Sequence, residues 1–253
     1  MKKPYIKKIM DIAGYEVWYV NGYYIRKHLD RAFPNYGGNR NFVFIPKNEF
    51  WIDYENGEKE ARYFVDTFLA LENALEEGKS HKEAIEIANK KEKSERDKSK
   101  SVKKLKKIKI KEELLKKIHK KPIFEKYTKN LKIWIVKGSI VRDLFDVDFN
   151  QGGHDKVYAF IPENEIWIDD SLYRKEIPYV LIHELHERKL MFKGWQYDSL
   201  GQSQFSRKGR ADRKSAHFAA EKLEFLIRNK PKKIKKVLLK EIKANEKLTY
   251  SKS

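Results

Sequence analysis

The chain has 253 residues, of which 40% are hydrophobic and 13% aromatic, so it is long and apolar enough for two ordinary globular domains. It contains no cysteine, which excludes disulfide bonds and thiolate metal ligands and leaves His, Asp and Glu to bind any metal ion. No apolar run approaches the roughly 18–20 residues that span a bilayer, and the first residues lack the apolar core of a signal peptide. We therefore expect a cytoplasmic protein with no membrane partner.

The formal net charge of +19 is concentrated in two segments. Residues 93–121 contain 14 Lys and Arg against 4 Asp and Glu, and residues 229–253 contain 9 Lys against 2 Glu. Lys-rich segments of this kind are typical of contacts with nucleic acid or another polyanion. The charge thus belongs to these two segments more than to the rest of the chain.

Residues 15–78 align with residues 131–194 without a gap, at a shift of 116 positions, and 20 of the 64 pairs are identical. A repeat of this length indicates a duplicated domain rather than a solenoid unit, whose period is about 20–50 residues. The alignment also supplies an internal control. Residues kept in both copies are expected to serve the fold, and residues present in only one copy are candidates for function.

In chain order, each copy begins with aromatic and β-branched residues around a glycine. WYV-NG-YYI (18–25) predicts a β-hairpin because Asn-Gly favours a two-residue turn, and WIV-KG-SIV (134–141) follows the same plan. A loop with a Gly pair follows, and then two short strands are expected at 41–46 and 49–53, and at 157–162 and 165–169. These segments predict a small, mostly antiparallel sheet in each copy.

Two helices are expected after each sheet, at about 59–77 and 80–95 in the first copy and at 175–193 and 213–229 in the second. Gly78 and Gly194 mark the end of the first helix in each pair, because glycine readily adopts the left-handed conformation there. The fold class is therefore α+β, a tandem duplication in which each copy is a small sheet followed by a two-helix hairpin. The expected domains are 1–95, a basic helical linker at 96–130, 131–228, and a basic C-terminal tail at 229–253.

The helices of the second copy carry a group of potential metal ligands. His183 and Glu187 lie on one face of the first helix, one turn apart, with Glu184 at the edge of that face and His186 on its other side. The second helix places the remaining candidates at positions i, i+4 and i+7, namely His217, Glu221 and Glu224. If the two helices pack antiparallel, these groups converge and can hold one divalent ion, which we expect to be zinc.

The first copy lacks most of these groups. Thr67, Phe68, Ala70 and Leu71 replace His183, Glu184, His186 and Glu187, and Ile85 and Asn89 replace His217 and Glu221. Only Glu224 keeps a counterpart, Glu92, which weakens its claim to be a ligand. Joint loss is expected of a buried cluster whose members satisfy one another. Keeping only half of such a charged set costs more free energy than losing all of it. A metal site and a structural ion-pair network both fit this pattern.

HELHE (183–187) resembles the active-helix motif HExxH of the zincin metallopeptidases, which supplies two metal ligands and a general base. This chain departs from the motif because position i+4 is Glu187, and His186 stands one residue early. The resemblance implies that His183 is a ligand, that Glu184 is the catalytic base, and that Glu187 takes the place of the second His.

The whole second copy, about 131–228, also resembles small uncharacterised phage and archaeal proteins through GGH, FIPENEIWID, HExxE and AHxxAxxxEF. That resemblance favours Glu224 as a ligand and carries no established activity. Asp169 and Glu165 have counterparts in the first copy, so scaffold roles are expected, although Asp169 could reach a metal as an extra ligand. His154, which follows the Gly pair, reads as a solvated loop residue.

Two functions are therefore expected. The first is a metal-dependent, zincin-like hydrolase with one intact and one degenerate domain. The alternative is a non-catalytic nucleic-acid-binding or virion- or nucleoprotein-associated protein, which would contact a polyanion through residues 93–121, 200–215 and 229–253. The segment 200–215 is an insertion between the helices of the second copy, and it carries Arg207, Lys208, Arg210, Arg213 and Lys214.

Overall fold

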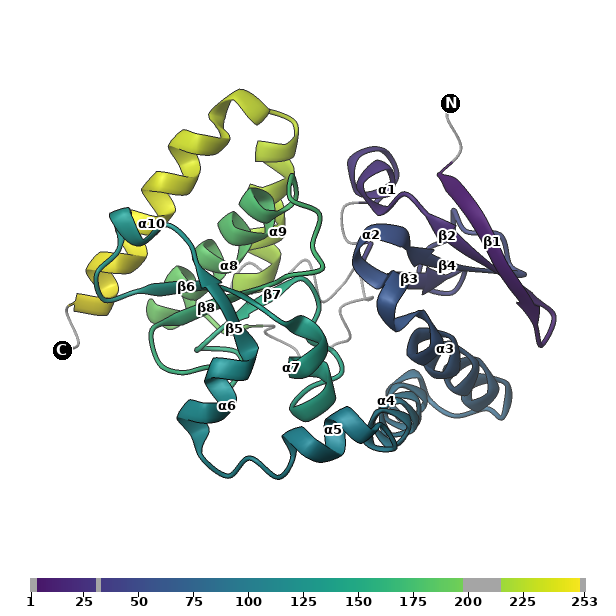
Figure 1. Cartoon of the computed structure of the whole chain (residues 1–253). Helices are drawn as coiled ribbons and strands as arrows, with labels where there is room; N and C mark the ends of the chain where they lie inside the picture. The colour runs from purple at the N-terminus through teal and green to yellow at the C-terminus, as the bar shows by residue number, and fades with distance from the viewer. Residues whose placement is uncertain (1–3, 31–32, 198–214, 251–253) are drawn as a thin grey trace. The chain divides into compact units, whose positions relative to one another are not determined.

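The computed structural model describes residues 4–30, 33–197 and 215–250. It divides the chain into two compact units, one formed by residues 1–118 and 138–150 and the other by residues 119–137 and 151–253. Each unit is mixed α+β and contains a four-stranded sheet (Figure 1). These limits differ from the expected domains. Residues 138–150 of the second copy belong to the first unit, and the expected tail belongs to the second unit.

The first unit contains β1 (Tyr5–Ile12), β2 (Tyr15–Val20), α1 (Gly22–His28), β3 (Tyr36–Gly38), β4 (Glu49–Asp53), α2 (Tyr54–Gly57), the 3-10 turn η1 (Glu58–Glu60), α3 (Ala61–Glu76), α4 (His81–Asp97), α5 (Lys100–Leu105), α6 (Lys111–Ile118) and α7 (Gly138–Leu144). The second contains β5 (His119–Pro122), η2 (Glu125–Tyr127), β6 (Lys132–Val136), β7 (Gly152–His154), β8 (Glu165–Asp169), α8 (Ile177–Phe192), α9 (Ala216–Arg228), η4 (Pro231–Lys233) and α10 (Ile234–Tyr250).

The two sheets have the same topology. Their strand orders are β1-β2-β4-β3 and β5-β6-β8-β7, with a parallel central pair and antiparallel outer pairs. The central registers are also equivalent, since Trp18 pairs with Trp51 and Trp134 pairs with Trp167, each shifted by 116 positions. The outer pairs agree with the expected antiparallel character, whereas the parallel central pair does not.

The predicted hairpin at Asn21-Gly22 is wrong, because a helix begins there. Asn21 is the N-cap of α1, and its side chain accepts a hydrogen bond of 2.8 Å from the Tyr24 backbone N–H. Glycine is needed at the next position because a Cβ on Gly22 would lie 1.9 Å from the buried Asp53 carboxylate. The chain therefore crosses over through α1 and β3 before it returns as β4, parallel to β2. The equivalent prediction at 134–141 fails in the same way, because α7 begins at Gly138.

Two further predictions for the sheets are corrected. The segments 41–46 and 157–162 form turns instead of strands, and the Gly pairs expected in loops lie in the short edge strands β3 and β7. Glycine fits these strands because side chains pack closely over them: a Cβ on Gly152 would lie 3.2 Å from the Val180 side chain of α8. The edge strands therefore bring a helix close to the sheet.

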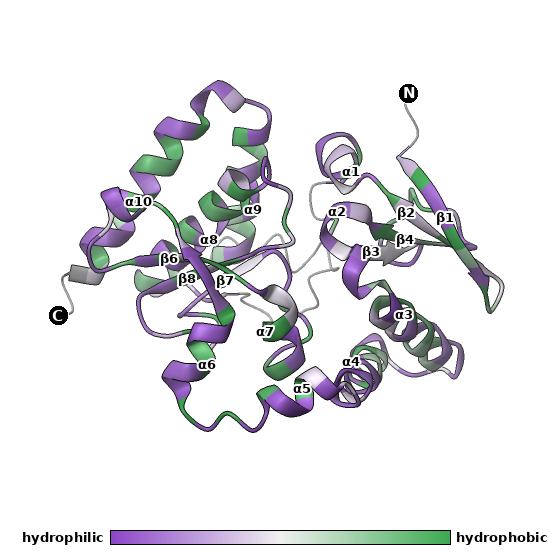
Figure 2. Ribbon diagram, viewed as in Figure 1, coloured by the Kyte–Doolittle hydropathy of each residue, from purple (hydrophilic) through white to green (hydrophobic). Residues whose placement is uncertain are grey.

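The four helices predicted after the sheets are present as α3 and α4 in the first unit and as α8 and α9 in the second. In the second unit, α8 packs on the sheet and is flanked by α9 and α10 (Figure 1). Its core joins Ile133 and Ile168 of the sheet to Leu181 of α8 and Ile242 of α10. Figure 2 shows hydrophobic and hydrophilic residues alternating along α10, as expected of an amphipathic helix. Among the described helices, none is both long and apolar enough to cross a membrane.

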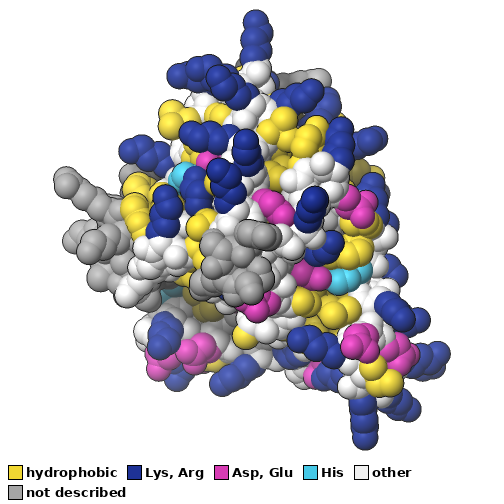
Figure 3. Space-filling view, turned by 90° about the vertical axis from the view of Figure 1, so that its left-hand side faces the viewer, with side chains coloured by type: hydrophobic (Ala, Val, Ile, Leu, Met, Phe, Trp, Pro, Cys, Tyr) yellow, Lys and Arg dark blue, Asp and Glu magenta, His cyan; other side chains and the backbone are white. Residues whose placement is uncertain are grey.

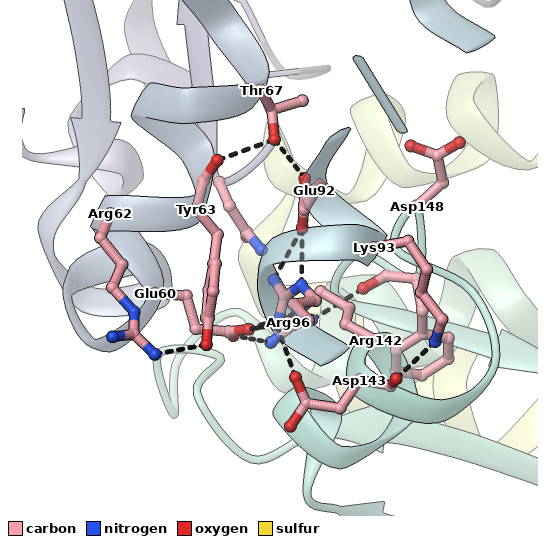
Figure 4. Close-up of polar contacts among 12 residues, drawn as sticks. Glu60, Arg62, Tyr63, Thr67, Glu92, Lys93, Arg96, Arg142, Asp143 and Asp148 are labelled. Carbon is pink, nitrogen blue, oxygen red and sulfur yellow. Dashed lines mark hydrogen bonds and ion pairs between the residues drawn. The ribbon is translucent and has the colours of Figure 1, made fainter. Parts of the chain in front are cut away.

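A buried cluster of charged side chains joins η1, α4 and α7 within the first unit (Figure 4). Arg96 of α4 is fully buried and donates to Glu60 at 2.7 Å, to Glu92 at 2.9 Å and to Asp143 at 3.0 Å. Glu60 also accepts hydrogen bonds from Arg142 of α7. Burial raises the pKa of Glu60, but the two guanidinium groups outweigh it and hold that pKa below its ordinary value.

Candidate metal centre

The site lies on α8, which is buried on nearly all sides. Pro178 in its first turn suits a helix start, and Gly194 follows its last turn with a φ of 83°, the left-handed conformation expected there. Because the sheet, α9 and α10 surround this helix, polar residues along it are also enclosed. His183 and Glu184 are each 8% exposed, and Glu187 is 2% exposed. Such groups are costly to bury unless they pair with one another or with an ion.

His183 has a different partner on each ring nitrogen. Its Nδ1 lies 3.1 Å from Glu224 Oε2, and its Nε2 lies 3.2 Å from His217 Nδ1 and 3.4 Å from Glu187 Oε2. An ionised carboxylate only accepts hydrogen bonds, so the Glu224 contact places a proton on Nδ1, and an ion would bind through Nε2 in place of its proton. Burial lowers the pKa of His183, but hydrogen bonds with Glu187 and Glu224 outweigh it and raise that pKa well above the ordinary value.

Glu187 lies at the centre of the cluster. Its Oε2 is 2.7 Å from His217 Nδ1, and its Oε1 is 3.0 Å from His154 Nε2. Burial raises the pKa of Glu187, but hydrogen bonds from His154, His183 and His217 hold it well below the ordinary value. The carboxylate is therefore ionised and contacts three imidazoles from two helices and a strand.

Glu184 is buried beside these groups and is the least stabilised carboxylate among them. One of its oxygens lies within 4.8 Å of ligand atoms of His154 and Glu187. Burial, followed by the charge of Glu187, raises the pKa of Glu184 to about 8. A carboxyl group whose pKa lies near neutrality can exchange a proton with a reacting group.

Three of the predicted ligands come together closely. His183, Glu187 and His217 each offer one atom within 4.8 Å of the others. Ligand atoms of a tetrahedral zinc ion, with bonds of about 2.0–2.1 Å, lie roughly 3.4 Å apart. The 3.2 Å and 3.4 Å separations from His183 Nε2 match that spacing, whereas the 2.7 Å between Glu187 Oε2 and His217 Nδ1 is a direct hydrogen bond that would have to open around an ion. Two imidazoles and one carboxylate are also the ligand set of zinc peptidases that keep a fourth position open.

Glu224 and Glu221 lie farther from this centre. Glu224 is held by Arg228 at 2.7 Å, and Arg228 in turn donates to Glu176 at 2.7 Å. Glu224 therefore orients His183 from behind and does not approach the other two ligand atoms. Glu221 Oε1 lies 4.0 Å from His217 Nε2, and its Oε2 is buried with no hydrogen-bond partner among the described residues.

His154 is part of the site, and its interpretation as a solvated loop residue is wrong. It is fully buried at the end of β7 and contacts Glu187. Comparison of the two copies does single it out, because the aligned residue of the first copy is Gly38, but the expected loop position favoured a solvated side chain. His186 instead faces α10, where its Nδ1 lies 3.1 Å from Lys189 Nζ and 3.4 Å from Glu241 Oε2.

The residues expected to serve the scaffold have structural contacts. Glu165 accepts hydrogen bonds from Trp167 at 2.7 Å and shares one of 3.0 Å with His119. Asp169 accepts a 2.8 Å hydrogen bond from the Ser171 backbone N–H at the end of β8. It is not among the groups of described residues that could hold a metal. The predicted basic insertion at 200–215 lies, except for Ser215, outside the described residues.

The corresponding place in the first unit is apolar. Phe68, which aligns with Glu184, stacks on Phe50 at 4.1 Å and packs against Gly38, where a Cβ would meet the Phe68 ring at 2.7 Å. Thr67, which aligns with His183, donates a 2.6 Å hydrogen bond to Glu92. The contact with the aligned glutamate, Glu92 or Glu224, is therefore present in both units, whereas the converging candidate ligands are present only in the second. Comparison of this chain with protein-family models, with curated proteins and with solved structures found no match.

Proposed function

We propose that the chain is a tandem duplication whose second copy is a metal-dependent hydrolase and whose first copy has lost the site. The observation that carries the proposal is the meeting of His183 Nε2, Glu187 Oε2 and His217 Nδ1, of which the His183 and Glu187 side chains are buried. The resemblance of HELHE to the zincin motif supports the same reaction class. A divalent ion, zinc in our proposal, would supply Lewis-acid activation of water and of a substrate carbonyl or phosphoryl group.

Equivalent contacts support the duplication. Glu60 and Glu92 bind Arg96 in the first unit, and the aligned Glu176 and Glu224 bind Arg228 in the second. The guanidinium groups also lie over aligned aromatic rings, Arg96 over Tyr63 at 4.4 Å and Arg228 over Tyr179 at 4.5 Å. A shared network of this kind is expected when both copies descend from one domain.

One aligned position carries opposite charges in the two copies, and each copy provides a partner of the opposite sign. Glu72 of the first unit pairs with Arg40 at 2.7 Å, whereas Arg188, which aligns with Glu72, pairs with Asp155 at 2.6 Å. The partners lie on the same aligned segment after the edge strand. Each copy thus keeps an ion pair in this place with opposite polarity, which supports a common origin followed by compensated substitution.

Each residue of the proposed site has its own role in metal binding or proton transfer. His183, Glu187 and His217 would bind the ion, with Glu224 holding the Nδ1 proton of His183. Glu184 would accept a proton from the attacking water, because its carboxyl group is buried beside the ligands. His217, whose side chain is 27% exposed, is the most accessible of the three proposed ligands.

Metal analysis tests the binding site. Purified protein incubated with zinc and then desalted is expected to retain about one ion per chain, and His183→Ala is expected to abolish retention because it removes the ligand that Glu224 orients. His186→Ala is the matched control, since it alters the same helix on the side facing α10. Absence of stoichiometric metal in the wild type, or its retention by His183→Ala, would contradict the proposal.

A second candidate function is polyanion binding, and it is favoured by the outer face of α10. Lys236, Lys240, Lys243 and Lys247 are exposed and recur at helical spacing on the side opposite the buried Leu238 and Ile242. Figure 3, which shows the side on which α10 lies in Figure 1, has many Lys and Arg side chains on that face. This function is compatible with hydrolysis in the same unit.

A further inference from the structure

His154 lies between the backbone of Lys156 and the carboxylate of Glu187. It ends the short strand β7, it is fully buried, and its ring nitrogens have different partners. The Lys156 backbone N–H donates to His154 Nδ1 at 3.2 Å, while Nε2 lies 3.0 Å from Glu187 Oε1. These contacts decide where the ring carries its proton.

A backbone N–H is only a donor, so the Nδ1 atom that faces Lys156 must offer a lone pair. The proton of the neutral ring is therefore on Nε2, which donates to Glu187. A doubly protonated ring does not fit, because Nδ1–H would oppose the Lys156 N–H. His183 would take the reverse tautomer with an ion bound, since its Nδ1 faces the Glu224 carboxylate and its Nε2 faces the other candidate ligands.

We propose that His154 is a positioning residue that fixes Glu187 through an Nε2–H hydrogen bond and does not itself bind the ion. This inference rests on the proposed function, which it deepens by defining the ligand set. The bond occupies Glu187 Oε1 and directs Oε2 toward His217 and His183. Glu187 then binds through one oxygen, and the three protein ligands leave a coordination position free for water or substrate.

In an alternative interpretation, His154, Glu184 and Glu187 hold a second ion. Their ligand atoms lie within 4.8 Å of one another. Binding through Nε2 would require the proton to move to Nδ1, where it would meet the Lys156 N–H. In the first unit Gly38 and Leu71 replace His154 and Glu187 together, which fits both roles, so the proton on Nε2 is the observation that separates them.

Nitrogen-15 NMR of histidine-labelled, metal-free protein tests the tautomer directly. The His154 signals, assigned by their loss in His154→Gln, are expected to show a protonated Nε2 and an unprotonated Nδ1. A protonated Nδ1 would overturn the inference. This measurement needs no bound metal, so it decides the role of His154 even if the wild type binds no zinc, a result that would count against the proposed function alone.

Zinc affinity separates positioning from ligation. His154→Gln keeps an N–H donor near the Nε2 position, so its affinity is expected to stay within about 3-fold of the wild type. His154→Met keeps the volume without a donor and is expected to lose about 10–100-fold, as outer-shell partners of ligands do. Equal losses in both variants would indicate a ligand, and no loss in either would indicate a purely structural residue. His119→Gln, which alters another Glu-bonded histidine of the same unit, is the control.

Discussion

Two glutamates of the site have the same side chain but different surroundings. Glu187 and Glu184 stand one turn apart on α8, yet three imidazoles surround the first, whereas no side-chain hydrogen bond to the second is found among the described residues. The pKa of Glu187 is therefore held well below its ordinary value, and that of Glu184 is raised to about 8. Carboxylates separated in this way can take different roles, one as a ligand and one in proton transfer.

Glu184→Gln should separate binding from catalysis. We expect the variant to retain its zinc ion, because Glu184 is not among the three close ligands, and to lose at least about 100-fold in kcat on any peptide or ester substrate that the wild type cleaves. Glu187→Gln, in contrast, should lose the ion. Parallel metal analysis and turnover assays check both, and full activity in Glu184→Gln would refute its role as the base.

Among the residues, the sequence identified three candidate ligands that lie close together in the structure, but it missed one residue of the cluster. Helical spacing placed His183 and Glu187 on one face, and the second helix supplied His217. His154 escaped because it precedes a turn, and only the sheet topology brings β7 beside α8. The role of Glu224 could not be decided from spacing, since a ligand and a residue behind a ligand both occur one turn from other candidates.

Among the elements, helices were predicted more accurately than strands. Periodic apolar residues and terminal glycines defined α3 and α8. Asn21-Gly22 was misread because the same dipeptide suits a hairpin turn and a helix N-cap, and the choice depends on Asp53, which is distant in sequence. Local turn preferences carry no information about the contact between Gly22 and Asp53.

The expected basic tail is a structural element. Asn245 of α10 donates a 2.8 Å hydrogen bond to the Leu185 carbonyl of α8, and Leu238 and Ile242 are buried in the core of the second unit. Glu246 accepts backbone hydrogen bonds from Lys129 and Asn130 at 3.0 and 2.9 Å and another from Leu131 at 3.0 Å. The helix therefore covers α8 and anchors the chain that leads into β6.

Glu246 should make the free energy of unfolding of the second unit depend on pH in the acid range. Burial raises the pKa of Glu246, but the backbone donors outweigh it and hold that pKa below the ordinary value of 4.5. The stabilisation is therefore complete above about pH 4.5 and is lost as pH falls through the lower pKa of the folded state. Glu246→Gln should cost about 1 kcal/mol near neutral pH and progressively less in acid.

Urea unfolding from pH 7 down to pH 3 checks this expectation. Glu163→Gln, at a side chain that is 71% exposed, is the control and should leave the pH profile unchanged. A constant difference between Glu246→Gln and the wild type at every pH would show that the carboxylate charge does not contribute.

For the whole molecule, the net charge of +19 leads to a prediction about salt. Because α10 is part of a core, deleting 229–253 would unfold the unit as well as remove charge. Replacing Lys236, Lys240, Lys243 and Lys247 with Gln isolates the electrostatic effect. If these lysines contact duplex DNA, the log–log slope of affinity against salt should fall by about 0.9 for each contact removed.

Replacing the same four lysines with Arg is the matched control and should preserve the slope. Fluorescence anisotropy with a labelled duplex between low and moderate salt measures both variants. A wild type whose affinity is independent of salt, or a Gln variant with an unchanged slope, would exclude this face as a polyanion-binding surface.

The placement of residues 138–150 in the first unit has a consequence for the folding of the chain. The Glu60 carboxylate is buried with Arg142, so a cut between the two sequence copies would leave buried charges without partners, a defect that typically costs 3–5 kcal/mol. The first sequence copy therefore has a structural role that does not depend on the proposed metal site. It supplies the folding environment of α7, a helix that lies within the second sequence copy.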